Sequence, residues 1–437
     1  MRGIKRIINN VLLKKNVIRF VLWIFLYRLL LDAIFNIYIS PLWDTTGYGL
    51  YSAVEFDYLM YFLSWSFLMI SMVWSYSWYS NNSTGSSVLI FIYCISFVPF
   101  SSMMGYSVFP LLFSFLNLLY WSFLGLFYYF LESKRHRSLH IKTRSQKPFS
   151  FIIVILAIFT MISLGYYSGF RIDLNILNAY DYRDEARNYT YPAYMTYLLG
   201  LSRIIIPTGI VLFLKSKKIL PLIIVFFSLM INYSFDGGKT LFFISFVAIL
   251  VGLFFKEKHA NLVVPAFPIV LIIGFIDYFY FTQYLFILII RRLLYVPNLI
   301  SSYVYDYTLN NSPNYFSQLL RFIGIESYNI DLNYYIGAVY FDSPLMSAND
   351  GMLSDALWQL GFTGVLIMPF IISIILYFLN RTTMNISKVF LFIPSFIIAY
   401  YLNNSSLTAA LFSHGIVVFI LLMALFHRNP TSKYIDN

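Results

Sequence analysis

The sequence predicts an all-α, polytopic integral membrane protein with about 12 transmembrane helices, and three observations lead to this fold class. Hydrophobic residues make up 59% of the 437 residues and charged residues only 11%, whereas a soluble domain has about 25% charged residues. Aromatic residues make up 21%, which excludes a disordered chain. A membrane-spanning helix needs about 20 apolar residues, so about 12 such helices would use just over half of this chain.

The predicted elements follow from the apolar runs, each of which is interpreted as one span. The first run is preceded by Arg2, Lys5, Arg6, Lys14 and Lys15, which places the N-terminus in the cytoplasm. Residues 1–437 are then a single membrane domain. The predicted spans cover residues 17–39, 57–78, 86–103, 108–131, 150–168, 193–214, 219–234, 240–255, 260–280, 356–378, 388–403 and 408–426.

The loops between the predicted spans alternate in charge. Lys and Arg concentrate in the loops that this path places inside, whereas Asp and Glu concentrate in those placed outside. This alternation follows the positive-inside rule and predicts that both termini are cytoplasmic. It also explains the net charge of +11 without the nucleic-acid binding that a basic soluble protein would suggest. The two external loops of interest are residues 169–192 and 281–355.

The loop over residues 281–355 exceeds common loop lengths, and long loops in compact proteins are usually functional. Its run Tyr284–Leu294 is apolar but short and ends near Arg291 and Arg292, so it is interpreted as an interfacial or re-entrant helix. The remainder is rich in Tyr, Asn, Ser and Asp. This composition suits a sugar surface, because rings pack on C–H faces and polar groups pair with hydroxyls. A Tyr and Asn bias of the whole chain explains the same composition.

Charged residues inside predicted spans are costly and usually face a partner or a cavity. Arg28 and Asp32 are four residues apart, so they are interpreted as a structural ion pair on one helix face. Arg203 lies about midway through its span and has no close partner in sequence. Its position leaves two interpretations open, a functional cavity or ordinary packing.

The stretch Asp236-Gly237-Gly238-Lys239-Thr240 resembles the end of a phosphate-binding P-loop. The first glycine of that motif is replaced by Tyr233, and no strand precedes it, so the motif is rejected. The stretch is interpreted as a tight glycine turn between two spans. A sharper hypothesis is that Lys239 meets an anionic group at the start of the next helix, where the helix dipole favours negative charge.

Neither a metal site nor a nucleophile motif is apparent. The histidines are scattered, and His136 and His140 lie in a basic loop without acidic residues beside them. The one cysteine, Cys94, lies in an apolar run, which is typical of an inert buried thiol. We therefore expect no metal and no thiol chemistry.

Several short stretches, taken in chain order, resemble one known family. They are Tyr182-Arg183-Asp184-Glu185-Ala186-Arg187, Arg203 with Pro207, Asp236-Gly237-Gly238-Lys239-Thr240, Arg292-Leu293-Leu294-Tyr295-Val296-Pro297, Tyr303-Val304-Tyr305-Asp306-Tyr307, Ser347-Ala348-Asn349-Asp350-Gly351 with Asp355, and Gly361-Phe362-Thr363-Gly364. They resemble the O-antigen polymerases, the Wzy-type oligosaccharide repeat-unit polymerases, over roughly residues 165–380. The Arg-x10-Gly loop motif of some members is absent. So is the histidine that O-antigen ligases carry, which favours a polymerase over a ligase.

The resemblance implies a GT-C-like membrane glycosyltransferase of the bacterial plasma (inner) membrane. Its substrates would be oligosaccharide repeats linked by pyrophosphate to undecaprenol, joined on the outer face into O-antigen, capsule or a related polysaccharide. The pyrophosphate leaving group supplies the activation, so no nucleotide sugar or other cofactor is needed. A chain-length regulator is a further partner that the resemblance leaves open.

Candidate site residues follow from these roles. Charge grows on the leaving pyrophosphate, which arginines can meet with fixed bidentate donors; ion pairing with loop carboxylates is the alternative for them. The residues expected at the pyrophosphate are Arg183, Arg187, Arg203, Lys239, Arg291 and Arg292.

A carboxylate base is expected to help the acceptor hydroxyl. Asp350, which precedes Gly351 in a turn, is favoured, and Glu185 is second. Asp355 is third, because it also suits the first turn of a helix beginning near Ala356. The residues expected to contact the glycan are Asn349, Tyr305 and Tyr307.

Alternatives from other classes stay open. A lipid-linked oligosaccharide flippase shares the length and location, but it predicts short loops and cations within helices. Most cations outside the cytoplasmic loops of this chain lie in two external loops. An ion-coupled transporter predicts paired broken helices at the midplane, and the sequence shows no such repeat.

Overall fold

The polypeptide is helical throughout the part described by the computed structural model, in which no strand occurs. The structure describes residues 2–46, 56–81, 83–133, 147–173, 175, 179–192, 194–257, 262–281, 283, 286–320, 331–348, 351–384 and 386–425. The all-α prediction is therefore confirmed for these residues.

Eight helical stretches among these residues are long and apolar enough to cross a membrane, which makes the chain a multi-pass membrane protein. They are α3 (Tyr58–Ser80), α4 (Thr84–Ile92) continued by η3 (Tyr93–Phe97) and α5 (Val98–Gly105), α6 (Leu111–Ser133), most of α7 (Lys147–Ser168), α9 (Tyr194–Lys215), α10 (Ile219–Asp236), α12 (Val263–Tyr280), and α16 (Met352–Leu360) continued by η8 (Gly361–Thr363) and α17 (Gly364–Thr383).

Four further helical segments coincide with the other predicted runs but do not meet this criterion. Helix α11 (Lys239–Phe254) has 16 residues and α18 (Lys388–Asn404) has 17. Helix α1 (Arg2–Ile34), continued by η1 (Phe35–Ile39) and α2 (Ser40–Thr46), carries several charges, and η9 (Ala409–Ser413) with α19 (Ile416–Leu425) is short. The total of about 12 spans stays a prediction.

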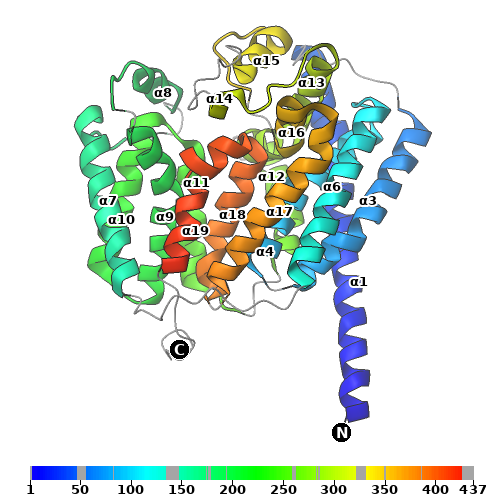
Figure 1. Ribbon diagram of the computed structural model, residues 1–437, viewed down its shortest axis with the longest axis horizontal. Coiled ribbons are helices and arrows are strands. Elements are labelled where there is room, and N and C mark those ends of the chain that lie inside the picture. The colour runs from blue at the N-terminus through cyan, green and yellow to red at the C-terminus, as the bar shows by residue number, and fades with distance from the viewer. Residues whose placement is uncertain are drawn as a thin grey trace.

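The two ends of the bundle differ (Figure 1). The small helices α8 (Ala179–Arg187), α14 (Ser317–Leu320) and α15 (Leu332–Phe341) cap one end, which we call the loop end. Helix α1 begins at the other end, which we call the opposite end. Helices α10 and α18 finish at the loop end, whereas α4, α12 and α18 begin at the opposite end.

The helices pack around α9 and α4. Helix α9 contacts α7, α10, α11, α18 and α19, and α4 contacts α3, α17 and α18. Helix α17 packs along α6, and α1 packs on α5 and α12. Cys94 is fully buried in η3, as predicted for an inert thiol.

The segment after α12 turns back into the bundle. The π-helix η6 (Phe286–Tyr295) lies against α12, where Phe286 and Ile290 are buried and the Phe286 amide donates to the Asp277 carboxylate at 3.2 Å. Helix α13 (Val296–Asn310) continues from it and packs on α16 and α15. The Asn298 amide reaches the Ser96 carbonyl in the middle of the α4–α5 stretch. This segment therefore links the loop end to the bundle interior.

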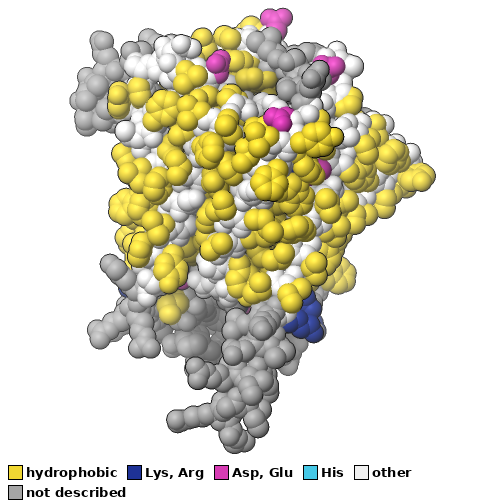
Figure 2. Space-filling model, turned by 90° about the vertical axis from the view of Figure 1, so that its right-hand side faces the viewer, with side chains coloured by type: hydrophobic (Ala, Val, Ile, Leu, Met, Phe, Trp, Pro, Cys, Tyr) yellow, Lys and Arg dark blue, Asp and Glu magenta, His cyan; other side chains and the backbone are white. Residues whose placement is uncertain are grey.

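The surface carries a broad apolar band, as a bilayer requires. In Figure 2 hydrophobic side chains cover most of the face, acidic side chains gather toward the loop end, and a basic patch lies toward the opposite end. Exposed residues such as Leu22, Phe62 and Val73 belong to this band.

Candidate functional site

The segment that follows α7 is fastened to the last turns of α10. The Asp173 amide donates to the Ser234 hydroxyl, which in turn donates to the Asp173 carbonyl, both at 2.9 Å. The Tyr182 hydroxyl of α8 donates to the Asp173 carboxylate, and the Tyr233 hydroxyl donates to the Asn175 carbonyl at 3.1 Å. These bonds place α8 directly over the loop end of α10.

An arginine that the sequence did not single out occupies this junction. Arg171 forms an ion pair with Glu185 at 2.7 Å and donates to the Ser234 carbonyl at 3.0 Å. Its guanidinium also lies over the Tyr182 ring, 4.3 Å from the centroid. Glu185, the second candidate base, is therefore held beside a cation and is 48% exposed in its side chain.

The arginines of α8 itself lie at the surface. Arg187 pairs with Asp184 at 2.9 Å, and both side chains are largely exposed. This is the loop ion pair that the alternative interpretation predicts for Arg187. Arg183 is half-buried and also has interaction partners. An exposed pair is worth about 0–1 kcal/mol, so it leaves Arg187 open to exchange its partner.

Arg203 lies deeper, and the structure gives it a partner. Its guanidinium forms an ion pair with Asp236, the last residue of α10, and the two side chains are 23% and 24% exposed. No hydrogen-bond partner for its Nε occurs within the described part of the chain. The Asp236 carboxylate also accepts from the Gly238 amide at 3.1 Å. Arg171 and Arg203 thus both attach to the last turn of α10.

The glycine turn between α10 and α11 is confirmed. Gly237 has a φ of +63°, a left-handed conformation that favours glycine, and it caps α10. Gly238 caps α11, whose amino-terminal dipole end therefore opens beside the Arg203–Asp236 pair. The side chain of Lys239 lies outside what the structure describes, so its predicted anion contact stays a prediction.

A histidine that looked isolated in the sequence joins this cluster. The His414 ring stacks on Tyr401 of α18, with centroids 4.1 Å apart and planes 9° apart. Its Nε2 lies 3.0 Å from the Ser405 hydroxyl, and Arg203 interacts electrostatically with both rings. No sequence signal pointed to His414, because its neighbours come from α9 and α18.

A close approach of two helices brings His414 and Arg203 together. A Cβ at Gly200 would overlap the carbonyl oxygen of Ser413, and Gly200 lies about one turn before Arg203 on α9. Only glycine permits this contact, so the position of η9 against α9 depends on Gly200.

Asp355, the third candidate base, is buried and fully engaged. It is 1% exposed, and its carboxylate accepts from the Leu407 amide at 2.7 Å and from the Gln359 amide at 3.3 Å. It lies in the first turn of α16, as predicted, although α16 begins at Met352 rather than near Ala356. These bonds hold the turn that carries Ser405, which favours a positioning role for Asp355.

Asn349 and Asp350, the favoured base, lie outside the described residues. Their neighbour Gly351 lines a small polar void of about 10 Å³ with Asn117, Asn298 and Asn403. A void of this size holds about one water molecule.

The remaining arginine candidates belong to another part of the bundle. Arg291 is half-buried and Arg292 is exposed on η6, which packs on α12, α13 and α5 rather than on α9 or α10. The structure therefore brings Arg203 and the glycine turn together beneath α8, and places Arg291 and Arg292 on a separate element.

The aromatic candidates on α13 face inward. Tyr305 and Tyr307 are only 4% and 7% exposed, with Tyr305 packed on Phe113 and Tyr307 on Trp358. The more accessible aromatic face of α13 and α15 consists of Tyr303 and Tyr340, whose rings stack at 4.5 Å, with Tyr334 and Tyr335 nearby on α15.

A carboxylate accompanies this aromatic face. The Tyr340 hydroxyl donates to the exposed Asp306 carboxylate at 2.6 Å. Burial of the phenol and the neighbouring Asp306 raise the pKa of Tyr340, so it stays protonated and donates. Stacked rings beside a hydrogen-bonding carboxylate suit a sugar ring.

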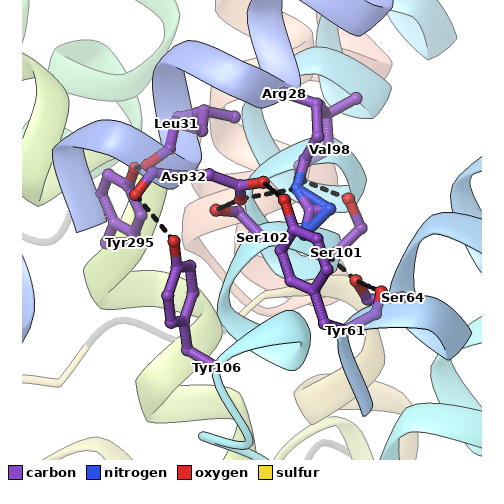
Figure 3. Close-up of polar contacts among 10 residues, drawn as sticks. All are labelled: Arg28, Leu31, Asp32, Tyr61, Ser64, Val98, Ser101, Ser102, Tyr106 and Tyr295. Carbon is purple, nitrogen blue, oxygen red and sulfur yellow. Dashed lines mark hydrogen bonds and ion pairs between the residues drawn. The ribbon is translucent and has the colours of Figure 1, made fainter. Parts of the chain in front are cut away.

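A second charged cluster lies within the bundle (Figure 3). Arg28 is fully buried, pairs with Asp32 at 2.9 Å and donates to the Ser64 hydroxyl at 3.1 Å. The Asp32 carboxylate also accepts from Ser102 at 2.6 Å and Tyr61 at 3.1 Å. The predicted ion pair is confirmed, and its bonds tie α1 to α3 and α5.

No group of three or more His, Cys, Asp or Glu side chains that could hold a metal ion occurs in the described part of the chain. The chain matches no protein-family model, no curated protein and no solved structure.

Proposed function

We propose that the chain is a membrane glycosyltransferase that polymerises undecaprenyl-pyrophosphate-linked oligosaccharide repeats on the outer face of the bacterial plasma membrane. The observation that carries the proposal is that Arg171 and Arg203 both bond to the last turn of α10, beside the start of α11. Two guanidinium groups and a helix amino terminus can donate to a diphosphate that displaces the Asp236 and Glu185 carboxylates from the arginines.

The orientation of this site supports an external reaction. Acidic side chains gather toward the loop end and basic ones toward the opposite end (Figure 2). The positive-inside rule then directs the opposite end to the cytoplasm and the loop end to the outside. Lipid-linked repeats that have been exported meet the protein on that side.

The chemistry requires few groups. The bond between the sugar anomeric carbon and the diphosphate oxygen breaks, and the acceptor hydroxyl oxygen forms the new glycosidic bond. Arg203 and Arg171 stabilise the charge that grows on the leaving diphosphate, a role worth roughly a hundredfold or more in rate. Asp236 and Glu185 neutralise these arginines before the diphosphate arrives.

The proton of the acceptor hydroxyl passes to a carboxylate. We assign this role first to Asp350 and second to Glu185. Glu185 is exposed and forms an ion pair with Arg171, one of the two arginines proposed at the diphosphate. Asp355 is fastened to the Leu407 amide and instead positions the turn next to His414. Arg183, Arg187, Lys239, Arg291 and Arg292 remain candidates for further contacts along the lipid-linked substrate.

The test is the glycan profile of a strain that lacks the gene, complemented with variants. Loss of the chain should leave single repeats on the final acceptor, and the wild-type chain should restore long polymers. Asp350→Asn keeps shape but removes proton acceptance, so it should leave lipid-linked single repeats unpolymerised. Normal polymers from Asp350→Asn, with loss of polymer in Glu185→Gln, would move the base to Glu185.

The same experiment separates the alternatives. A flippase predicts lipid-linked repeats that accumulate on the cytoplasmic face, and a ligase predicts long polymers that stay on the lipid carrier. Either profile would overturn the assignment as a polymerase.

A further inference from the structure

A cavity of about 480 Å³ opens at the opposite end of the bundle, away from the site described above. Its volume lies within the range of about 300–1,000 Å³ that is typical of sites for drug-sized ligands. It is much larger than a single ion or water molecule needs. Neither the sequence analysis nor the proposed polymerase activity assigns it a role.

Six helices reach this cavity through their ends. Helices α3, α6 and α17 finish beside it, and α4, α12 and α18 begin beside it. The ends of membrane-spanning helices lie at the boundary between hydrocarbon and water. The cavity is therefore at the depth of the lipid headgroups.

A polar network forms one wall. The Asn380 side chain accepts from the Gly85 amide at 2.5 Å and donates to Tyr128 at 2.9 Å and to Glu132 at 2.8 Å. The Thr84 and Thr383 hydroxyls lie 2.6 Å apart. These bonds hold the ends of α4, α6 and α17 in fixed positions, so the cavity has a rigid wall.

The rest of the lining is amphiphilic. Arg381 in the last turn of α17 and Lys388 at the start of α18 supply two positive charges. Two carboxylates accompany them: Glu132 accepts from Asn380, and Glu257 accepts from the Ser387 hydroxyl and the Lys388 amide. The Arg381 guanidinium is braced by Tyr377, whose hydroxyl accepts from Nη1 at 2.9 Å. The apolar lining residues are Phe91, Val263, Met384, Ile386, Leu391 and Phe392.

We propose that this cavity holds a membrane phospholipid, with the phosphate between Arg381 and Lys388 and an acyl chain along the apolar wall. The Arg381 and Lys388 side chains complement the phosphodiester, and the apolar wall distinguishes a lipid from free phosphate. The depth of the cavity matches that of a headgroup in the adjoining leaflet. A bound lipid would bridge α4, α12, α17 and α18 and stabilise their packing. The inference does not depend on the polymerase assignment.

The test is lipid retention by the purified full-length protein, measured by native mass spectrometry during titration with phosphatidylglycerol. Arg381→Gln with Lys388→Gln should weaken binding of this lipid by about tenfold or more, because two charge-assisted contacts are lost. Lys217→Gln with Lys218→Gln is the matched control. It removes the same charge from exposed residues at the same end, outside the cavity lining, and should leave binding unchanged.

A second variant guards against misfolding. Ser87→Trp fills the cavity and keeps both cations, so it should also lower phosphatidylglycerol binding. In a separate control, diacylglycerol, which lacks the phosphate, should bind the wild-type protein weakly. Equal retention of the lipid by both cavity variants and the control would overturn the proposal. Displacement of the lipid by inorganic phosphate would assign the site to free phosphate and would equally overturn it.

Discussion

Arg203 of α9 and Asp236 of α10 form an ion pair at the loop end, although 33 residues separate them. The pair lies beside the left-handed turn at Gly237, and Arg171 reaches the same turn of α10 through the Ser234 carbonyl. The Asp236 carboxylate is therefore already paired with Arg203, the cation that the proposed diphosphate would contact. If a diphosphate binds at this site, it has to displace the Asp236 carboxylate from Arg203, and this has measurable consequences.

The first prediction concerns the geometry of Arg203. Arg203→Lys keeps the charge but loses the planar fork that binds two oxygens. We expect polymer formation to fall by roughly a hundredfold, as for other lost transition-state contacts. Glycan profiles at matched protein levels measure this. Arg19→Lys, at an exposed position on α1, is the control, and a normal profile for Arg203→Lys would move the diphosphate site elsewhere.

The second prediction concerns Asp236, which competes for Arg203. Asp236→Asn removes the competing charge and keeps an oxygen for the Gly238 amide. Added pyrophosphate should then inhibit polymerisation at about tenfold lower concentration than in the wild type, because the guanidinium has lost its charged partner. Dose–response curves with purified protein measure the change. Unchanged inhibition would show that anions do not reach Arg203.

The third prediction concerns orientation. In a Cys94→Ala background, a membrane-impermeant thiol reagent added to intact cells should label Asn310→Cys, at the exposed end of α13, and not Lys217→Cys, at the turn between α9 and α10. Labelling of Lys217→Cys only after the cells are opened completes the test. The reverse labelling pattern would show that the protein has the opposite orientation in the membrane, and the site at the loop end would then not be external.

Much of the fold could be predicted because each hydrophobic run by itself indicates a helix. Every predicted run corresponds to helix, and the Arg28–Asp32 pair followed from a spacing of four residues. The site could be predicted from the sequence only in part, because its contacts join segments that are distant in the sequence. His414 stacks on Tyr401 and lies near Ser405, beside the close packing at Gly200, which no local pattern encodes.

The aromatic candidates show a second limit of sequence reasoning. The composition of residues 281–355 suited a sugar surface, and the family resemblance pointed to Tyr305 and Tyr307, but neither could tell which face of α13 points inward. Tyr305 and Tyr307 turned out to be buried, whereas Tyr303 and Asp306 lie on the face that meets Tyr340 of α15. The face depends on packing against α16, which comes later in the chain.

The fourth prediction follows from that face. If Tyr303 and Tyr340 stack on the glycan, Tyr340→Ala should raise the concentration of lipid-linked acceptor needed for half-maximal polymerisation by up to about tenfold. A ring contact is worth about 0.5–1.5 kcal/mol, as measured for aromatic pairs, and 1.4 kcal/mol corresponds to about tenfold. Tyr305→Phe, which changes only a buried hydroxyl, should leave this concentration unchanged. An equal effect of both variants would indicate a packing role for the whole segment.

The last prediction concerns the Arg28–Asp32 cluster (Figure 3). Asp32 accepts from Arg28, Ser102 and Tyr61, and these bonds fasten α1 to α3 and α5, so we interpret the cluster as structural. Removing one partner leaves the other charge buried alone, which costs about 3–5 kcal/mol, whereas replacing both with apolar residues is often nearly neutral. Arg28→Met alone and Asp32→Leu alone should therefore destabilise the protein strongly.

The double variant decides between structure and function. Arg28→Met with Asp32→Leu should recover most of the stability lost in either single variant, as measured by thermal unfolding in detergent, and should retain polymer formation. The interaction energy from this cycle isolates the pair, because its two members are in direct contact at 2.9 Å. A double variant that folds as stably as the wild type but makes no polymer would show that the buried charges take part in the reaction, and the structural interpretation would fail.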